Sequence, residues 1–218
     1  LIKVQLGGEI RYKDNFRLNG VALFRVDSQG LKLFVDAGLT IGSAENNYFD
    51  LHALGVLIIN KQGLATDLEV TLKIGQDLSK SLDSSGLDIT ARVLMNTSGQ
   101  EQSVDIPDEF LDSLSDTTLA RLKTAAGDAI DTNGDGKVST EELNAARQAP
   151  GLLTYTVPGA APSLATLFGE AGASAEPLSP NGFYIAVVFS ATLKFGGSFD
   201  LTGKFGVLVT SEKFELLI

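Results

Sequence analysis

Six residues in the segment 131–142, which reads DTNGDGKVSTEE, could direct oxygen atoms at a single point: five alternate along the chain and the sixth follows three positions later. They are Asp131, Asn133, Asp135, Lys137, Ser139 and Glu142. Calcium takes six to eight oxygen ligands at about 2.3–2.6 Å, and carboxylates, amides and backbone carbonyls all serve. Lys137 needs only its carbonyl, Ser139 binds directly or through water, and Glu142 closes the shell with both carboxylate oxygens. The spacing therefore predicts a Ca²⁺ site.

Two further residues fit the same pattern. Gly136 stands where the chain must turn sharply, and Val138 is apolar at the eighth position. Over residues 129–148 the chain resembles the EF-hand and dockerin-type calcium loops. We find no second loop of this kind, and EF-hands normally work in pairs. The resemblance therefore implies a structural site with a Kd on the order of 10⁻⁵–10⁻³ M.

Helical patterns flank this loop. Pro107 opens a short helix, and Asp116 is the N-cap expected for a second helix over Thr117–Ile130, whose apolar residues fall on one side. The exit helix is expected over Glu141–Gln148, stopped by Pro150. Residues 150–182 are rich in Pro, Gly, Ala and Ser and predict mostly loop. Together, residues 97–181 form an expected insertion.

The flanks, residues 1–96 and 182–218, show a different periodicity. Apolar residues alternate with polar ones over 31–41, 64–74, 183–195 and 199–209. A period of two predicts long, half-buried antiparallel strands. The segments 27–30, 61–63 and 196–197 carry turn chemistry between them. We expect a mainly β, sandwich- or solenoid-like domain that carries the helical insertion.

The flanks also repeat themselves. Residues 23–42 and 56–75 both contain Gln-Gly-Leu and both close on Leu-x-Ile-Gly, and residues 193–208 form a third, partial copy. Each unit is a hairpin that cannot bury its apolar face alone. With the stretch LMNTSGQE at 94–101, these motifs are similar to tandem repeats in very large bacterial surface and secreted proteins. That resemblance implies a structural or adhesive extracellular module.

The composition limits the classes of partner. A net charge of −10 argues against nucleic acid and against an anionic membrane surface, since both need clustered Lys and Arg. The absence of cysteine excludes thiol nucleophiles and cysteine-based metal sites. No apolar run approaches 18 residues.

No set of residues predicts an enzyme. His52, the only histidine, falls on an alternating strand, and no Gly-x-Ser-x-Gly motif is present. Paired carboxylates of glycosidase type stay open among 27 acidic residues, but nothing singles out a pair. Asn96-Thr97-Ser98 matches a glycosylation sequon, which is a weak signal.

These observations favour a calcium-stabilised structural repeat of an extracellular filament, surface-layer or adhesin-type protein. The alternative is a calcium-dependent module that binds carbohydrate or another ligand. The chain starts at Leu1, and we interpret it as part of something longer. Residues 206–218 begin a hairpin unit and residues 1–8 resemble its close, with a one-residue slip that a bulge would absorb. We therefore expect head-to-tail contacts between copies through strand pairing.

Overall fold

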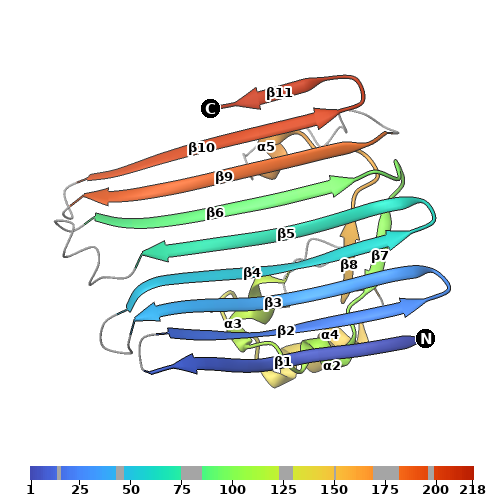
Figure 1. The fold of residues 1–218 in the computed structure, drawn as a ribbon, viewed down its shortest axis with the longest axis horizontal. Helices are drawn as coiled ribbons and strands as arrows, with labels where there is room; N and C mark the ends of the chain where they lie inside the picture. The colour runs from blue at the N-terminus through green and yellow to red at the C-terminus, as the bar shows by residue number, and fades with distance from the viewer. Residues whose placement is uncertain are drawn as a thin grey trace.

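A computed structural model of the chain describes residues 1–13, 16–42, 47–74, 85–122, 130–149, 151–168, 182–195 and 199–218. The fold is mainly β, as predicted, and its dominant element is one antiparallel sheet (Figure 1). The strand order in this sheet is β1-β2-β3-β4-β5-β6-β9-β10-β11. Neighbouring strands in the sheet are neighbours in sequence, except where β6 is followed by β9.

The strands of the large sheet are long, as the extended alternation predicts. They are β1 (Ile2–Tyr12), β2 (Phe16–Asp27), β3 (Gly30–Gly42), β4 (Asn47–Asn60), β5 (Gly63–Ile74), β6 (Ser85–Asn96), β9 (Tyr184–Phe195), β10 (Phe199–Thr210) and β11 (Phe214–Leu217). β6 and β9 pair from Ser85–Phe195 to Asn96–Tyr184, so everything between them leaves and re-enters the sheet at one place.

The two Gln-Gly-Leu turns are built alike, which supports the repeat seen in the sequence. Asp27 accepts a hydrogen bond from the amide of Gln29 at 2.8 Å, and Asn60 accepts one from Gln62 at 2.8 Å. The glycine that follows has a positive φ, 132° at Gly30 and 148° at Gly63, which other residues rarely adopt. Both segments are therefore tight hairpin turns, as expected.

A second layer lies behind the sheet in Figure 1 and comes from the chain between β6 and β9. It contains the two-stranded sheet of β7 (Gln102–Asp105) and β8 (Thr154–Val157). Its helices among the described residues are α2 (Asp108–Leu111), α3 (Asp116–Arg121), α4 (Thr140–Gln148) and α5 (Leu164–Leu167). We call this layer the insertion layer.

The structure confirms some of the expectations for the insertion and corrects others. The exit helix is confirmed as α4, and Pro107 does open a helix. The helix expected over Thr117–Ile130 is wrong in length, because Leu122 is already extended; residues 123–129 lie outside the described part. Its N-cap is Ser115 rather than Asp116, because the Ser115 hydroxyl accepts from the amide of Thr118. The expectation that residues 150–182 form mostly loop is wrong in part, because this range contains β8 and α5.

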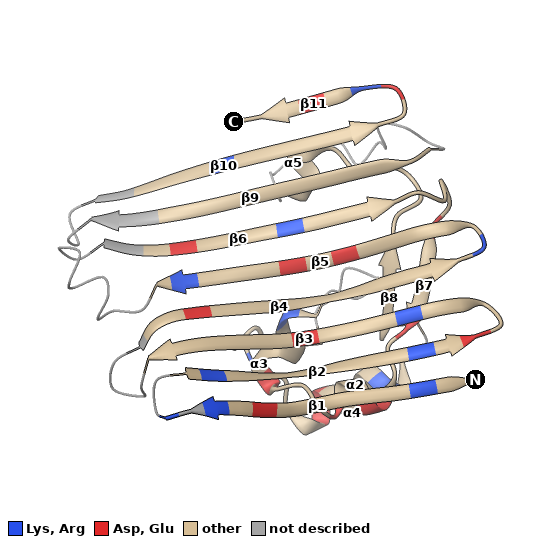
Figure 2. Ribbon diagram, in the orientation of Figure 1, with Lys and Arg blue, Asp and Glu red and all other residues tan. Residues whose placement is uncertain are grey.

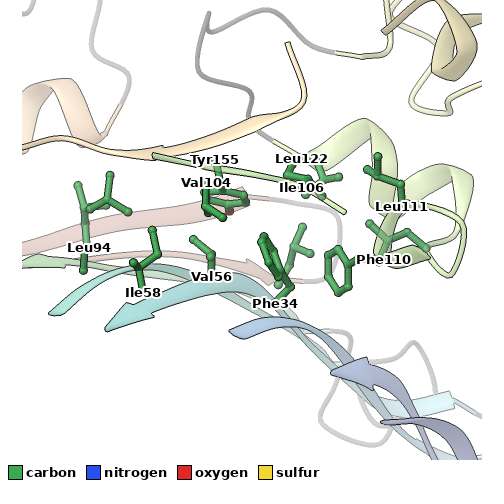
Figure 3. Close-up of a cluster of buried hydrophobic side chains, with 14 of the residues drawn as sticks. Phe34, Val56, Ile58, Leu94, Val104, Ile106, Phe110, Leu111, Leu122 and Tyr155 are labelled. Carbon is green, nitrogen blue, oxygen red and sulfur yellow. The ribbon is translucent and has the colours of Figure 1, made fainter. Parts of the chain in front are cut away.

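The hydrophobic core lies between the insertion layer and one face of the sheet, which we call the covered face. Phe34 of β3 and Phe110 of α2 illustrate the contact, with ring centroids 5.5 Å apart. Figure 3 shows side chains of the sheet pointing toward those of the insertion layer. The buried apolar residues of the sheet are Val21, Leu23, Phe34, Leu54, Val56, Ile58, Ala65, Leu94, Tyr184, Ala186, Val188 and Leu208.

The opposite face of the sheet, which we call the open face, takes the apolar residues of the alternating pattern. In β3, for example, Leu33 and Val35 lie on the open face because Phe34 between them is buried on the other side. Within the described part of the chain, the insertion layer lies on the covered face alone (Figure 1). The alternating apolar residues therefore lie on the face turned away from the insertion layer. The core is formed instead by apolar residues at the intervening positions of the strands.

A candidate calcium loop and a polar cleft

The loop 131–142 is held by its own amides. The two carboxylate oxygens of Asp131 accept from the amides of Gly134 at 2.7 Å and Gly136 at 2.8 Å. The side-chain oxygen of Asn133 accepts from the amide of Asp135 at 2.8 Å. Gly134 and Gly136 have φ values of 74° and 82°, which explains why glycine stands at both positions. The result is a compact turn whose backbone is already ordered.

Glu142 joins the two ends of the loop. One carboxylate oxygen accepts from the amide and hydroxyl of Thr132, at 3.0 and 2.8 Å, and the other from the amide and hydroxyl of Ser139, both at 2.9 Å. The Ser139 hydroxyl in turn accepts from the Glu142 amide, which completes a capping box at the start of α4. The hydrogen bond from the Ser139 backbone, followed by that from the Thr132 hydroxyl, lowers the pKa of Glu142 from 4.5 to about 2.

Val138, at the eighth position of the loop, is bound by residues outside the loop. Val138 is 3% exposed and belongs to the core, and its amide donates to the carbonyl of Asp116 at 3.2 Å. Ile130, just before the loop, is buried too. The apolar residues thus fix the loop to the insertion layer, while its polar residues face solvent. The bond to the first residue of α3 holds this end of the loop in place.

The six residues predicted to bind the ion lie within this one loop. Their donor set is oxygen only, which fits Ca²⁺ and excludes metals that need sulfur or imidazole. The carboxylates point to the loop's amides and hydroxyls, however, and in the described residues no three His, Cys, Asp or Glu side chains form a group that could hold a metal. Calcium would compete with the hydrogen bonds that Glu142 makes to Thr132 and Ser139.

A second polar site lies between the sheet and α3 and was not predicted. His52 of β4 donates from Nε2 to Asp36 Oδ1 of β3 at 2.5 Å, and its Nδ1 accepts from Arg121 of α3 at 3.0 Å. Arg121 also donates to Glu69 of β5 at 2.6 Å. These four side chains connect three neighbouring strands to α3, the helix that precedes the loop 131–142.

The chain of polar groups borders a cleft of about 640 Å³. The cleft is also lined by amide and hydroxyl side chains, namely Gln5, Asn19, Ser113, Ser115, Thr117 and Thr118. Both ring nitrogens of His52 are engaged by Asp36 and Arg121, so the ring has no free lone pair with which to take a proton from a substrate. The cleft can offer hydrogen bonds to a polar ligand.

One signal in the sequence pointed to this cluster. Asp36, His52 and Glu69 occupy polar positions of three strands that are consecutive in the sheet, so they share one face. Registering the strands by their turns would have brought them together. Arg121 carries no such signal, because a helix docks by packing and the sequence does not give its position.

Asn96 does not behave as a glycan acceptor in the folded chain. It is 0% exposed, and its amide donates to the carbonyls of Gln100 at 2.8 Å and Pro158 at 2.9 Å. Its oxygen accepts from the amide and hydroxyl of Ser98. The residue therefore organises the turn that leaves β6.

Comparison with protein-family models, with curated proteins and with solved structures finds no match for this chain. Among the described residues, none of the helices has both the length and the apolar character needed to cross a membrane.

Proposed function

We propose that the chain is a calcium-stabilised structural module of an extracellular or cell-surface assembly, and that its copies join head to tail by pairing strands. One observation carries the proposal. β1 and β11 lie at opposite lateral edges of the sheet, and neither has a strand on its outer side among the described residues (Figure 1). Unpaired edges offer rows of amides and carbonyls to another chain.

The geometry of the β11 edge suggests how copies would meet. β11 pairs only with Gly206–Val209, so in the described sheet the stretch of β10 from Phe199 to Phe205 has no partner on that side. Eight successive antiparallel pairings give β1 and β11 the same direction. A copy placed in line with β11 would thus offer β1 antiparallel to this stretch of β10, with Ile2 and Val4 on the open face.

Cross-linking tests the edge contact, and the chain has no cysteine to interfere. If Leu1 of one copy follows Ile218 of the next without a gap, the register that pairs Leu217 with Gly206 continues until Lys3 lies opposite Thr202. The Lys3→Cys/Thr202→Cys variant should therefore form ladders with a short bismaleimide. Each single variant, and a Lys61→Cys/Thr202→Cys pair whose turn cysteine lies away from both edges, should give no ladder. Absence of multimers in the first variant, with no filaments in electron micrographs, would refute head-to-tail assembly.

The calcium part of the proposal has its own test. Glu142→Gln keeps an oxygen that can accept from Thr132 or Ser139 but removes the charge and the second oxygen that calcium needs. Saturating calcium at a hundredfold Kd should raise the free energy of unfolding of the natural chain by about 2.7 kcal/mol. The Gln variant should lose this gain, whereas the neighbouring control Glu141→Gln should keep it. Identical unfolding in calcium and in chelator would remove calcium from the proposal.

The cleft beside His52 favours a second candidate, a module that binds a small polar ligand such as a carbohydrate. Hydroxyl and amide side chains line one concave site, as sugar recognition requires, although no aromatic side chain is among them. A nuclear magnetic resonance titration with mono- and disaccharides tests this. Shifts confined to the Asp36–His52 region, abolished in Asn19→Ala, would favour it, and unchanged spectra would exclude the tested sugars.

A further inference from the structure

The open face is apolar from one lateral edge of the sheet to the other. Each charged residue in the nine strands has the register of the covered face, and Figure 2 shows how few strand positions carry charge. Thr66 is a polar residue of this face, and its hydroxyl donates to the Val56 carbonyl at 2.7 Å. Residues of this face with high exposure include Ile2, Val4, Leu6, Ile10, Leu18, Val26, Ile41, Ile59, Phe189, Leu201, Phe205, Phe214 and Leu216.

The size of the open face sets it apart from an ordinary apolar patch. Nine strands about 4.8 Å apart and about 11 residues long, at 3.3 Å a residue, span roughly 1,500 Å². The largest patch on a typical monomer is about 300–600 Å². A standard interface buries about 800 Å² on each partner, and obligate dimers bury more, with an interface that resembles a divided domain core. The area is thus that of an obligate interface.

The relief of the open face is complementary to itself. One row of directly opposed residues crosses the sheet in strand order: Gly8, Gly20, Ala37, Ala53, Val70, Ala91, Phe189 and Phe205. The row begins with the smallest side chains and ends with two of the largest. Phe189 and Phe205 are 36% and 40% exposed, whereas no atom lies within 4 Å of a Cβ added at Gly8. One half of the row is a groove and the other is a ridge.

The groove is fixed by the backbone. A Cβ added at Gly20 would lie 2.6 Å from the Asp36 carbonyl oxygen and 2.9 Å from the Cα of Ala37. A larger residue at Gly20 would therefore push β2 and β3 apart. The groove at Gly20 is therefore set by the close approach of β2 and β3, and a side chain at position 20 cannot fill it.

We propose that the open face is an interface between two copies of this chain, packed sheet on sheet about a twofold axis. The axis would lie at about 15° to β5, half the usual crossing angle of packed sheets, and pass over Val70, the residue that β5 contributes to the row. Since β5 is the middle strand of nine, the axis places β2 of one copy over β10 of the other and β3 over β9. Gly20 then receives Phe205, and Ala37 receives Phe189.

Charge favours a second copy over a lipid surface as the occupant. The open face is neutral, so the pairing desolvates no charged group. The molecule as a whole carries −10, which opposes approach to anionic lipid. Two sheets packed with strands crossing at about 30° give the usual β-sandwich geometry. This contact uses the face of the sheet and is independent of the edge pairing proposed above.

The test compares a charge on either face. At protein concentrations too low for head-to-tail multimers, sedimentation should give the natural chain twice its monomer mass of 23.0 kDa. Phe189→Asp, on β9 and away from the β10 stretch used by the edge contact, should give a monomer with an unchanged strand signal in circular dichroism. Ile59→Asp, at a more exposed position of the same face, serves if the first variant does not fold. The matched control Thr90→Asp places the same charge on the covered-face side of β6 and should remain dimeric. A monomeric natural chain, or dissociation of all variants alike, would overturn the proposal.

Cross-linking then checks the twofold arrangement. Ala37 and Phe189 are four strand spacings apart in one chain, about 19 Å, beyond a short bismaleimide. The Ala37→Cys/Phe189→Cys variant should therefore yield covalent dimers, while Ala37→Cys alone should not, because the two copies of Ala37 do not face each other. A chain that stays monomeric and floats with neutral phosphatidylcholine vesicles would show that lipid occupies the face, and would also overturn the proposal.

Discussion

The pair of Asp67 and Arg92 offers a sharp test of how well the covered face is shielded from water. Asp67 of β5 is 3% exposed, and Arg92 of β6 donates to both its oxygens, from Nε at 2.8 Å and from Nη2 at 2.5 Å. Arg92→Leu removes both donors and leaves a carboxylate with no charged partner at a site that water hardly reaches. Breaking a buried pair in this way costs about 3–5 kcal/mol.

The double variant Asp67→Leu/Arg92→Leu separates the pair from its burial. It replaces both groups by apolar side chains, and such replacements are neutral or stabilising by about 1–4 kcal/mol. Urea denaturation should therefore show a large loss of stability for the single variant and recovery in the double. A loss below about 1 kcal/mol for Arg92→Leu, or no recovery in the double, would show that Asp67 is better solvated than its exposure indicates.

Three further outcomes follow from the described contacts. Phe110→Ala removes a buried ring that contacts Phe34 and should lower the free energy of unfolding by about 3–5 kcal/mol in urea denaturation; a loss under about 1 kcal/mol would place Phe110 outside the core. Because the folded pKa of Glu142 lies below its usual 4.5, its contribution to loop stability is present above that pH and lost as pH falls toward about 2. A carboxyl titration by nuclear magnetic resonance checks this, and a midpoint near 4.5 would contradict it. The Val138 amide should exchange slowly with solvent because it donates to Asp116, and exchange as fast as in an unstructured peptide would deny that bond.

The sequence was sufficient for the long strands of the large sheet, the two Gln-Gly-Leu turns and α4. The alternation over 31–41 gave β3 because a two-residue period is incompatible with a helix, and the Asp27 and Asn60 turns use local side-chain bonds. The six candidate residues of the loop 131–142 could be placed within one turn for the same reason, since their spacing is local. Calcium binding itself is predicted from this spacing alone.

The covered face was harder to foresee, although a signal for it was present. At Leu33-Phe34-Val35 and at Val93-Leu94-Met95 the alternation gives way to continuous apolar residues, so apolar side chains lie on both faces of these strands. Phe34 and Leu94 are indeed core residues. The early end of α3 had no local signal, and neither did the position of Arg121, because both depend on how the insertion layer packs against the sheet.

The return of the chain at β9 has a consequence for how the molecule folds. Asn96 and Tyr184 are directly paired, although residues 97–183 separate them, and both side chains donate to the carbonyl of Pro158, at 2.9 and 2.8 Å. The whole insertion is thus a closed loop. Its two ends meet at a neck, where the hydrogen bonds of Asn96 and Tyr184 to Pro158 hold them together. Closing so long a loop is slow, whereas β1–β6 and β9–β11 each form from local hairpins. We expect two partial sheets to form early and to merge only when the neck closes, so folding should have a late, concerted step at β6 and β9.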